Sequence, residues 1–373
     1  MFQPGLNEDL AATSVWGTQQ LNLFPEATRE GVFAMWYGKG PGLDRSMDVF
    51  KHANNAGTGK HGGVLLIAGD DHGAKSSTVA YQSEHILQAA GIPVLYPSSV
   101  QEYLDYGIHG WAMSRYSGLW VSMKCVTDVV ESSASVDIDV NRVQPIYPED
   151  FELPADGLNI RWPDTPLAQE ERLNNYRWYA ALAYVRANKI DRIVFDSPNA
   201  KFGIMTAGKA YLDVRQALID LGLDEKNCTT LGIRLYKVGC VWPLEAQGAR
   251  EFATGLDEIL VVEEKRQIME YAIKEELYNW RDDVRPEVYG KYDAKDGGGG
   301  EWSVPRGPWL LPPNAELSPA IIAKAIAQRL LKREIPAEIR ATIEARIAII
   351  RAKEKDAARI SVVSERKPWF CSG

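Results

Sequence analysis

Residues Gly63-Val64-Leu65-Leu66-Ile67-Ala68-Gly69-Asp70-Asp71-His72 form a short apolar run that ends in two acids and a histidine. A short apolar run of this kind is typical of a buried strand. Similar runs recur in the first third of the chain, at 31–35, 92–95 and 119–124. Helical patterns separate them, near 9–23, 45–55 and 98–116. This alternation predicts an α/β fold, with a parallel sheet covered by helices over residues 1–140.

The N-terminus departs from that plan. The chain opens with a helical pattern, and its first strand comes only near residue 32. Doubly wound domains usually begin with a strand. We therefore predict that the first domain is incomplete at its N-terminus, where its opening strand is missing.

Three further segments follow the first domain. Residues 141–190 combine a stretch rich in Pro, Asp and Glu with a helical pattern, and predict a linker and helix. Apolar runs alternating with helical patterns predict a second α/β domain over 191–280. Residues 281–373 predict a Gly/Pro-rich connector and a charged helical arm near 319–355. That arm is either a solvated bracing helix or a docking arm for a partner.

Composition excludes several classes of protein. The chain has 373 residues with a formal net charge of −8, so it lacks the basic footprint of a nucleic-acid-binding protein. No apolar run approaches the length of about 20 residues that spans a membrane, and we expect no signal peptide at Met1–Gly5. The cysteines form no C-x-x-C pair, so no zinc or iron–sulfur site is expected from Cys125, Cys228, Cys240 and Cys371. Scattered thiols favour a reducing cytoplasm.

The opening helix carries acids in its first turn. Asn7 is a capping residue type, and Glu8 and Asp9 suit the positive end of the helix dipole. Alternatively, Glu8 points out of the helix end into a cofactor cleft. The spacing of the residues does not choose between these two readings.

Glycine-rich residues follow the first predicted strand. Within Trp36-Tyr37-Gly38-Lys39-Gly40-Pro41-Gly42-Leu43-Asp44, three glycines and a proline predict an irregular loop with exposed backbone N–H groups. Open α/β sheets bind ligands at the carboxyl ends of strands, where this loop would lie. It matches neither the dinucleotide fingerprint nor the P-loop, and a plain turn is the alternative.

Polar residues also follow the second strand, in Asp70-Asp71-His72-Gly73-Ala74-Lys75-Ser76-Ser77. They allow a divalent-metal site, a turn held by aspartate side chains, or a polar active-site loop. One short cluster rarely supplies a full set of metal ligands, so we predict no metal site. A polar active-site loop is favoured because polar residues recur in the neighbouring loop.

Two motifs of the second domain allow functional readings. Residues 204–211 predict a strand that turns directly into a helix, whose N-terminus is either a tight structural turn or an anion site. Glu263-Glu264-Lys265 ends a predicted strand. We expect this triplet to be solvated, and docking is the alternative.

Together these motifs resemble the indolepyruvate (arylpyruvate) ferredoxin oxidoreductase family, most closely its long fused bacterial form. The stretches that resemble its pyrimidine-binding domain are 7–13, 35–42, 69–72, 75–77, 82–84 and 100–105. Residues from about 193 to 277 resemble its transketolase-C-terminal-like domain, with matching motifs at 236–239 and 242–244.

The resemblance implies roles for individual residues. In this family a helix-borne glutamate hydrogen-bonds the aminopyrimidine ring of thiamine diphosphate, and Glu8 stands at the matching position. The residues then implied to bind or surround the cofactor are Asn7, Lys39, Gly40, Gly42, Asp70, Asp71, His72 and Ser76. Trp36, Tyr37 and Trp111 are implied to suit an aromatic substrate.

The resemblance also implies a reaction, the oxidative decarboxylation of indolepyruvate or another arylpyruvate to an acyl-CoA with ferredoxin as electron acceptor. The family's Gly-Asp-Gly motif for magnesium diphosphate and its iron–sulfur cysteines do not occur in this sequence. The magnesium and the clusters are then held by other domains or subunits, the chain alone is inactive, and it acts in an oligomer with coenzyme A as a substrate. The rival hypotheses are a subunit of a non-oxidative thiamine enzyme and a non-catalytic scaffold subunit.

Overall fold

The computed structural model describes residues 2–293, apart from Ser76 and Thr78, and residues 309–360. It contains two compact units. The first comprises Met1–Asp70, Tyr81–Arg192 and Val238–Gly248, and the second Asp71–Ala80, Ile193–Lys237 and Ala249–Gly373. The helix predicted within 141–190 thus lies in the first unit, and the described residues beyond 281 lie in the second.

The first unit is built on a five-stranded sheet with the order β1-β2-β4-β3-β8. Its strands are β1 (Phe33–Lys39), β2 (Gly63–Asp70), β4 (Val121–Val126), β3 (Val94–Leu95) and β8 (Cys240–Trp242). The first four are parallel, and β8 runs antiparallel to β3. The predicted parallel α/β sheet is confirmed, and β1 forms its edge.

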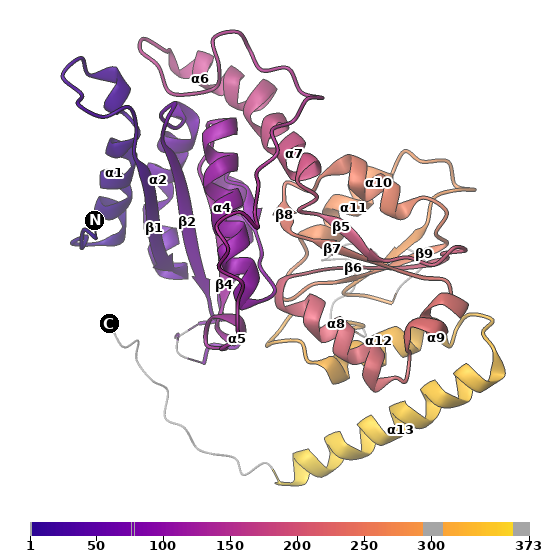
Figure 1. Cartoon of the computed structure of the whole chain (residues 1–373). Coiled ribbons are helices and arrows are strands. Elements are labelled where there is room, and N and C mark those ends of the chain that lie inside the picture. Colours follow the sequence, from indigo (N-terminus) through magenta and orange to yellow (C-terminus); the bar gives the residue numbers. More distant parts are fainter. Residues whose placement is uncertain (1, 76, 78, 294–308, 361–373) are drawn as a thin grey trace. The chain divides into compact units, whose positions relative to one another are not determined.

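Helices cover both faces of this sheet (Figure 1). Trp36 on β1 packs edge-to-face on Phe50 of α2 (Gly40–Ala56), whereas Phe33 packs on Trp111 of α4 (Val100–Ser117). Residues an odd number of positions apart on a strand face opposite sides, so α2 and α4 lie on opposite faces. The other helices of this unit are α1 (Glu8–Thr18), α3 (Glu84–Ala90), α5 (Thr127–Val130), α6 (Pro166–Arg172) and α7 (Trp178–Ala187).

The irregular loop predicted at 36–44 is wrong. Residues up to Lys39 continue β1, and α2 begins directly at Gly40. Pro41 fits the first turn of a helix, because the N–H that proline lacks has no partner there in any helix. The strand therefore passes into the helix without a loop between them.

The segment that precedes α6 has no helix or strand and is held by a buried arginine. Arg177, in a π-helical turn (Leu173–Arg177) between α6 and α7, is completely buried. Its guanidinium donates to the carbonyl of Leu158 at 2.9 Å and to the last carbonyls of α2, those of Asn54, Asn55 and Ala56, at 2.6–3.1 Å. One side chain thus supplies hydrogen-bond donors to the backbone carbonyls of both the connecting segment and the end of α2.

The second unit has a sheet of order β10-β9-β6-β7-β5, and the predicted second α/β fold is confirmed. Its strands are β10 (Glu287–Tyr289), β9 (Glu258–Val262), β6 (Phe202–Ala207), β7 (Ile233–Val238) and β5 (Arg192–Phe195). Residues 204–211 form the expected direct strand-to-helix turn, from β6 into α8 (Gly208–Asp220). The remaining helices along this part of the chain are α9 (Glu225–Thr230), α10 (Ala246–Ala253) and α11 (Met269–Leu277).

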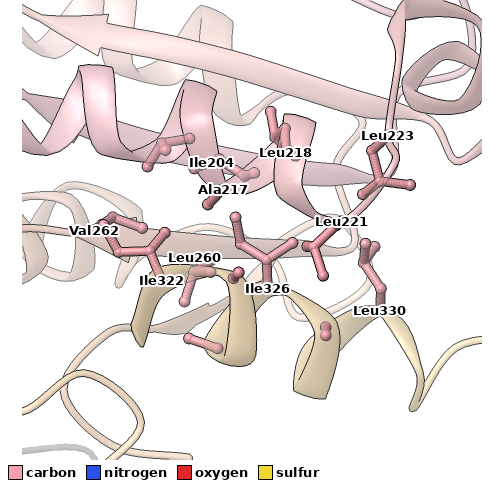
Figure 2. Packing of buried hydrophobic residues seen from close by; sticks show 14 of the residues in the cluster. Ile204, Ala217, Leu218, Leu221, Leu223, Leu260, Val262, Ile322, Ile326 and Leu330 are labelled. Atoms are coloured by element: carbon pink, nitrogen blue, oxygen red, sulfur yellow. The ribbon is translucent and has the colours of Figure 1, made fainter. Parts of the chain in front are cut away.

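The predicted charged arm is two helices, and the first of them is part of the core. In α12 (Pro319–Leu330), Ile322, Ile326 and Leu330 pack against α8 and against Leu260 of β9 (Figure 2). Their spacing of four residues places them on one helix face. The solvated bracing helix expected at 319–355 is therefore wrong for α12, which forms a layer of the second unit.

The second helix, α13 (Ala337–Ile360), is amphipathic. Ile339, Ile343 and Ile347 are buried, also at a spacing of four residues, whereas most of the remaining side chains are solvent-exposed. Only this part of the arm has the mixed charge and exposure that the sequence predicts.

Candidate active site

Glu8 is the first residue of α1, and its backbone is fixed from two directions. The Asn7 side chain accepts the N–H of Leu10 at 3.0 Å, which is the capping bond that the sequence predicts. The indole N–H of Trp36 donates to the Glu8 carbonyl at 3.0 Å. The first bond caps α1 and the second holds the helix end against β1, so the backbone at Glu8 is fixed.

The Glu8 carboxylate itself stays accessible. Its side chain is 38% exposed, and Arg45 of α2 approaches its Oε2 at 3.5 Å. The same guanidinium pairs more closely with Asp9, at 3.0 Å. Glu8 therefore keeps an open carboxylate at a helix N-terminus, in a position where a ligand can reach it.

Two glycines of α2 allow close packing at the start of this helix, one against Glu8 and one against Tyr81. A β-carbon on Gly42 would lie 2.7 Å from the Glu8 Cγ, and one on Gly40 would lie 2.0 Å from the ring of Tyr81. Both distances are too short for any side chain. The structure thus brings Gly42 against Glu8, next to Asn7 in the chain, whereas Gly40 lies against Tyr81 and Lys39 is the N-cap residue of α2.

Asp70 occupies a different kind of environment. Its carboxylate is buried, accepts the Ser83 N–H at 2.9 Å, and pairs with Lys124 at 3.3 Å. Lys124, also buried, forms a second ion pair with Glu84 at 2.5 Å. Asp70 therefore stabilises the end of β2, and its charge is already matched inside the first unit.

Asp71 and His72 belong to the second unit. Asp71 accepts the backbone N–H groups of Lys75 at 2.9 Å and Ser77 at 3.0 Å, so the turn held by aspartate side chains is present. His72 is buried, and its Nδ1 lies 2.5 Å from Glu264. Ser76, the last of the predicted loop residues, lies outside the described part of the chain. Asp70, Asp71 and His72 thus divide between the two units.

The expectation that Glu263-Glu264-Lys265 is solvated is wrong, because all three side chains are buried. Besides His72, Glu264 accepts from Lys209 at 3.2 Å and from the Leu317 N–H at 3.0 Å. A charged residue can leave water when several groups replace its hydration in this way. The partners are distant in the sequence, so no local pattern indicates them.

Glu263 is buried at the start of α11. Its carboxylate accepts the N–H groups of Ile268, Met269 and Glu270 at 2.9–3.1 Å. Burial raises the pKa of Glu263 to about 7, although these bonds and Lys291 lower it. Burial likewise lowers the pKa of Lys291 to about 8. This network shapes the second unit, and the sequence reveals none of it.

The thiols of the described chain are buried and weakly acidic. Burial raises the pKa of Cys125 to about 12 and that of Cys228 to about 11. Cys240 is buried as well. Cys371 lies outside the described residues. Within the described residues, no helix is long and apolar enough to cross a membrane.

Solved structures share the fold of this chain. A 2-oxoglutarate:ferredoxin oxidoreductase from Magnetococcus marinus, solved with 2-oxoglutarate, coenzyme A and succinyl-CoA bound, aligns with a TM-score of 0.54 and 15% identity over 87% of this chain and 56% of its own. A split-gene transketolase, described as an inactive β4 tetramer, gives 0.50 and 11% over 89% and 84%. The chain therefore has the α/β fold of 2-oxoacid oxidoreductases and transketolases.

Sequence relatives narrow this class to one family. Residues 191–360 match the family model of the indolepyruvate ferredoxin oxidoreductase middle domain. Indolepyruvate oxidoreductase subunit IorA of Methanothermobacter marburgensis is 27% identical over 72% of this chain and 40% of its own length. That of Methanothermobacter thermautotrophicus is 26% identical over 79% and 44%. The resemblance is thereby confirmed: the chain is related to the indolepyruvate ferredoxin oxidoreductases, and it spans less than half the length of these curated relatives.

Proposed function

We propose that this chain is part of a thiamine-diphosphate-dependent 2-oxoacid:ferredoxin oxidoreductase that converts indolepyruvate or another arylpyruvate to an acyl-CoA. The observation that carries the proposal is the accessible Glu8 carboxylate at the N-terminus of α1, against which Gly42 of α2 packs closely. Relatives that carry the name indolepyruvate oxidoreductase support the substrate class.

The residues around Glu8 fit the aminopyrimidine ring of thiamine diphosphate. Because Gly42 has no β-carbon, the start of α2 packs directly against the Glu8 side chain and holds it in place. Glu8 would share a proton with a ring nitrogen, and Asn7 and Trp36 would hold its backbone in place. Thiamine diphosphate, when bound, supplies the carbanion chemistry that decarboxylates 2-oxoacids. The contribution of this chain is then to position one carboxylate and hold one proton.

The same reasoning assigns lesser roles to the other predicted residues. Gly42 would line the ring site because it packs against Glu8, and Lys39 and Gly40 would extend this wall because they directly precede it at the start of α2. Asp70, Asp71 and His72 would shape the loop after β2 through the ion pairs and turn that hold them. For Ser76 the role in cofactor binding stays a prediction.

We further propose that other polypeptide segments complete the enzyme and hold its magnesium, diphosphate and iron–sulfur clusters. Among the described residues, β1 pairs only with β2, so its outer edge is available to a further strand. The side chains of Phe33, Met35 and Tyr37 are exposed on one face of β1. An unpaired edge with exposed apolar residues favours pairing with another segment. The buried thiols favour a cytoplasmic location.

The test is reconstitution with a diphosphate-binding and iron–sulfur partner, followed by turnover of indolepyruvate with coenzyme A and ferredoxin. Glu8→Gln keeps the side-chain size but removes the charge, and we expect a loss of about 10²- to 10⁴-fold in kcat, the usual contribution of a proton-transferring group. Asp9→Asn is the matched control, since Asp9 shares the helix turn and the contact to Arg45. Equal losses in both variants would contradict the assignment of Glu8.

The same preparation separates the rival hypotheses. Turnover that does not need ferredoxin indicates a non-oxidative thiamine enzyme, a class that the transketolase fold also allows. Turnover unaffected by Glu8→Gln indicates a scaffold subunit.

A further inference from the structure

The first unit contains a second candidate site, a pocket of about 310 Å³ away from Glu8. Its walls come from α4, from residues 142–146 of the connecting segment, and from the junction of α7 with β5. A volume of this size is at the lower end of the range for small-molecule sites.

The walls of this pocket are fixed by direct bonds. The Asn188 side chain forms two hydrogen bonds of 2.8 Å with the backbone of Ile146, one as donor and one as acceptor. Arg142 pairs with Asp105 of α4 at 2.7 Å. These contacts attach the connecting segment to both α7 and α4, so the pocket is formed before any ligand arrives.

Tyr106 lines this pocket and has a buried hydroxyl, which lies beside Gly239. The residue is 4% exposed, and no group of the described residues accepts its proton. Burial raises the pKa of Tyr106 well above its usual value, so the hydroxyl stays protonated at neutral pH. Buried donors nearly always find an acceptor, and here a ligand can supply it.

Two cations also line the pocket, Arg192 and Lys189. Arg192 pairs loosely with Glu102, at 3.6 Å, and also interacts with Tyr106 and Asp191, whereas the other carboxylate oxygen of Glu102 accepts from Ser98 at 2.8 Å. Lys189 is exposed, and it forms no ion pair with any described residue. His109 does not add a charge, because burial lowers the pKa of its imidazole.

Lys189 is also strained. It lies two residues beyond the end of α7 with a φ of 49°, in the left-handed conformation that usually requires glycine. The backbone around it closes the helix normally, since the Ile190 N–H donates to Val185 at 3.1 Å. A lysine at this position therefore has a cost that its packing does not explain, and such residues gather at functional sites.

We propose that this pocket binds a small anion carrying a carboxylate or a phosphate group, through Tyr106, Lys189 and Arg192. The three side chains offer donors in excess of acceptors, and guanidinium and ammonium groups are the usual partners of both anions. The carboxylates of Glu102 and Asp105 are already engaged by protein donors. The site is separate from the proposed cofactor site, and it stands whether or not that proposal holds.

The test is calorimetric titration of the full chain with inorganic phosphate and with malonate, at constant ionic strength in chloride. We expect saturable binding of at least one anion with a stoichiometry of one. The anion that binds more tightly shows whether the natural ligand carries a phosphate or a carboxylate group. Arg192→Gln should weaken binding about tenfold, the value of a charge-assisted hydrogen bond. Tyr106→Phe should weaken it several-fold.

Two further variants separate binding from folding. Lys189→Gly removes the charge and relieves the strain, so it should bind more weakly and yet raise the Tm. Lys51→Gln changes the same charge on an exposed position of α2 and should leave both unchanged. Absence of saturable binding to either anion, or equal affinities in the wild type, Arg192→Gln and Tyr106→Phe, would overturn the proposal.

Discussion

Gly42 and Glu8 come from different helices, and their contact is so close that a β-carbon on Gly42 would lie 2.7 Å from the Glu8 Cγ. Gly42→Ala should therefore displace either the carboxylate or the start of α2. We expect the reconstituted enzyme to lose at least about tenfold in kcat/KM, because small displacements of a catalytic group reduce rates strongly. Steady-state assays measure this.

A second glycine supplies the control for that change. Gly17 lies within α1, and a β-carbon added there would meet no atom within 4 Å. Gly17→Ala should keep full activity and stabilise the helix by about 0.5–1 kcal/mol. If Gly42→Ala behaves like Gly17→Ala, the close contact has no role in the site.

Arg177→Met should destabilise the first unit severely. The change removes a buried guanidinium and leaves the carbonyls of Leu158, Asn54, Asn55 and Ala56 without their donors. We expect a loss of about 3–5 kcal/mol in the free energy of unfolding, as for other broken buried charge networks. Denaturant titration measures it, with the exposed Arg29→Met as a control expected to change less than about 0.5 kcal/mol.

Lys124→Met should be equally harmful, because it leaves Asp70 and Glu84 as two buried carboxylates without their cation. Again about 3–5 kcal/mol is expected. Glu84→Gln added to Lys124→Met should restore part of this loss, since it removes one of the unpaired charges. Strict additivity of the two changes in unfolding experiments would contradict a shared network.

Asp191 predicts a pH dependence of stability. Burial raises its pKa from 3.8 to about 7, even though the N–H groups of Gly239 and Cys240 bond its Oδ1. Between pH 4 and 7 the unfolded chain releases this proton and the folded chain retains it. The contribution of Asp191 to the free energy of unfolding is therefore largest below pH 4. It decreases by up to about 4 kcal/mol as the pH rises to 7.

Asp191→Asn isolates that contribution from all other carboxylates. The asparagine keeps an oxygen for Gly239 and Cys240 but does not titrate. The free energy of unfolding of the wild type, minus that of Asp191→Asn, should become more negative from pH 4 to 7. A constant difference across this range would show that Asp191 does not carry a raised pKa.

Much of the fold can be predicted from the sequence, because buried strands are short apolar runs and the helices between them have an apolar face. The run at 63–69 becomes β2 (Gly63–Asp70), and that at 119–124 overlaps β4 (Val121–Val126). Residue composition misleads at 36–44. Glycine and proline suggest a loop there, although Pro41 is compatible with a first helical turn. Proline is common both in loops and in the first turn of a helix, so composition alone does not separate the two.

The candidate site is less predictable than the fold. Asn7 as the cap of α1 follows from residue type alone. By contrast, the burial of Glu264 depends on His72, Lys209 and Leu317, which no pattern in the sequence places beside it. The family resemblance is confirmed, whereas the cofactor roles of Glu8 and of the loop residues stay predictions.

The open edge of β1 has a practical consequence for anyone who purifies this chain. Phe33, Met35 and Tyr37 stand exposed along a strand whose outer hydrogen-bonding groups have no strand partner among the described residues. Without a natural partner, copies of the chain should self-associate through this edge, and precipitation should increase with protein concentration. Met35→Lys places a charge on β1. It should keep the isolated chain monodisperse in light scattering, and it should abolish binding of the chain to the partner in the reconstituted enzyme.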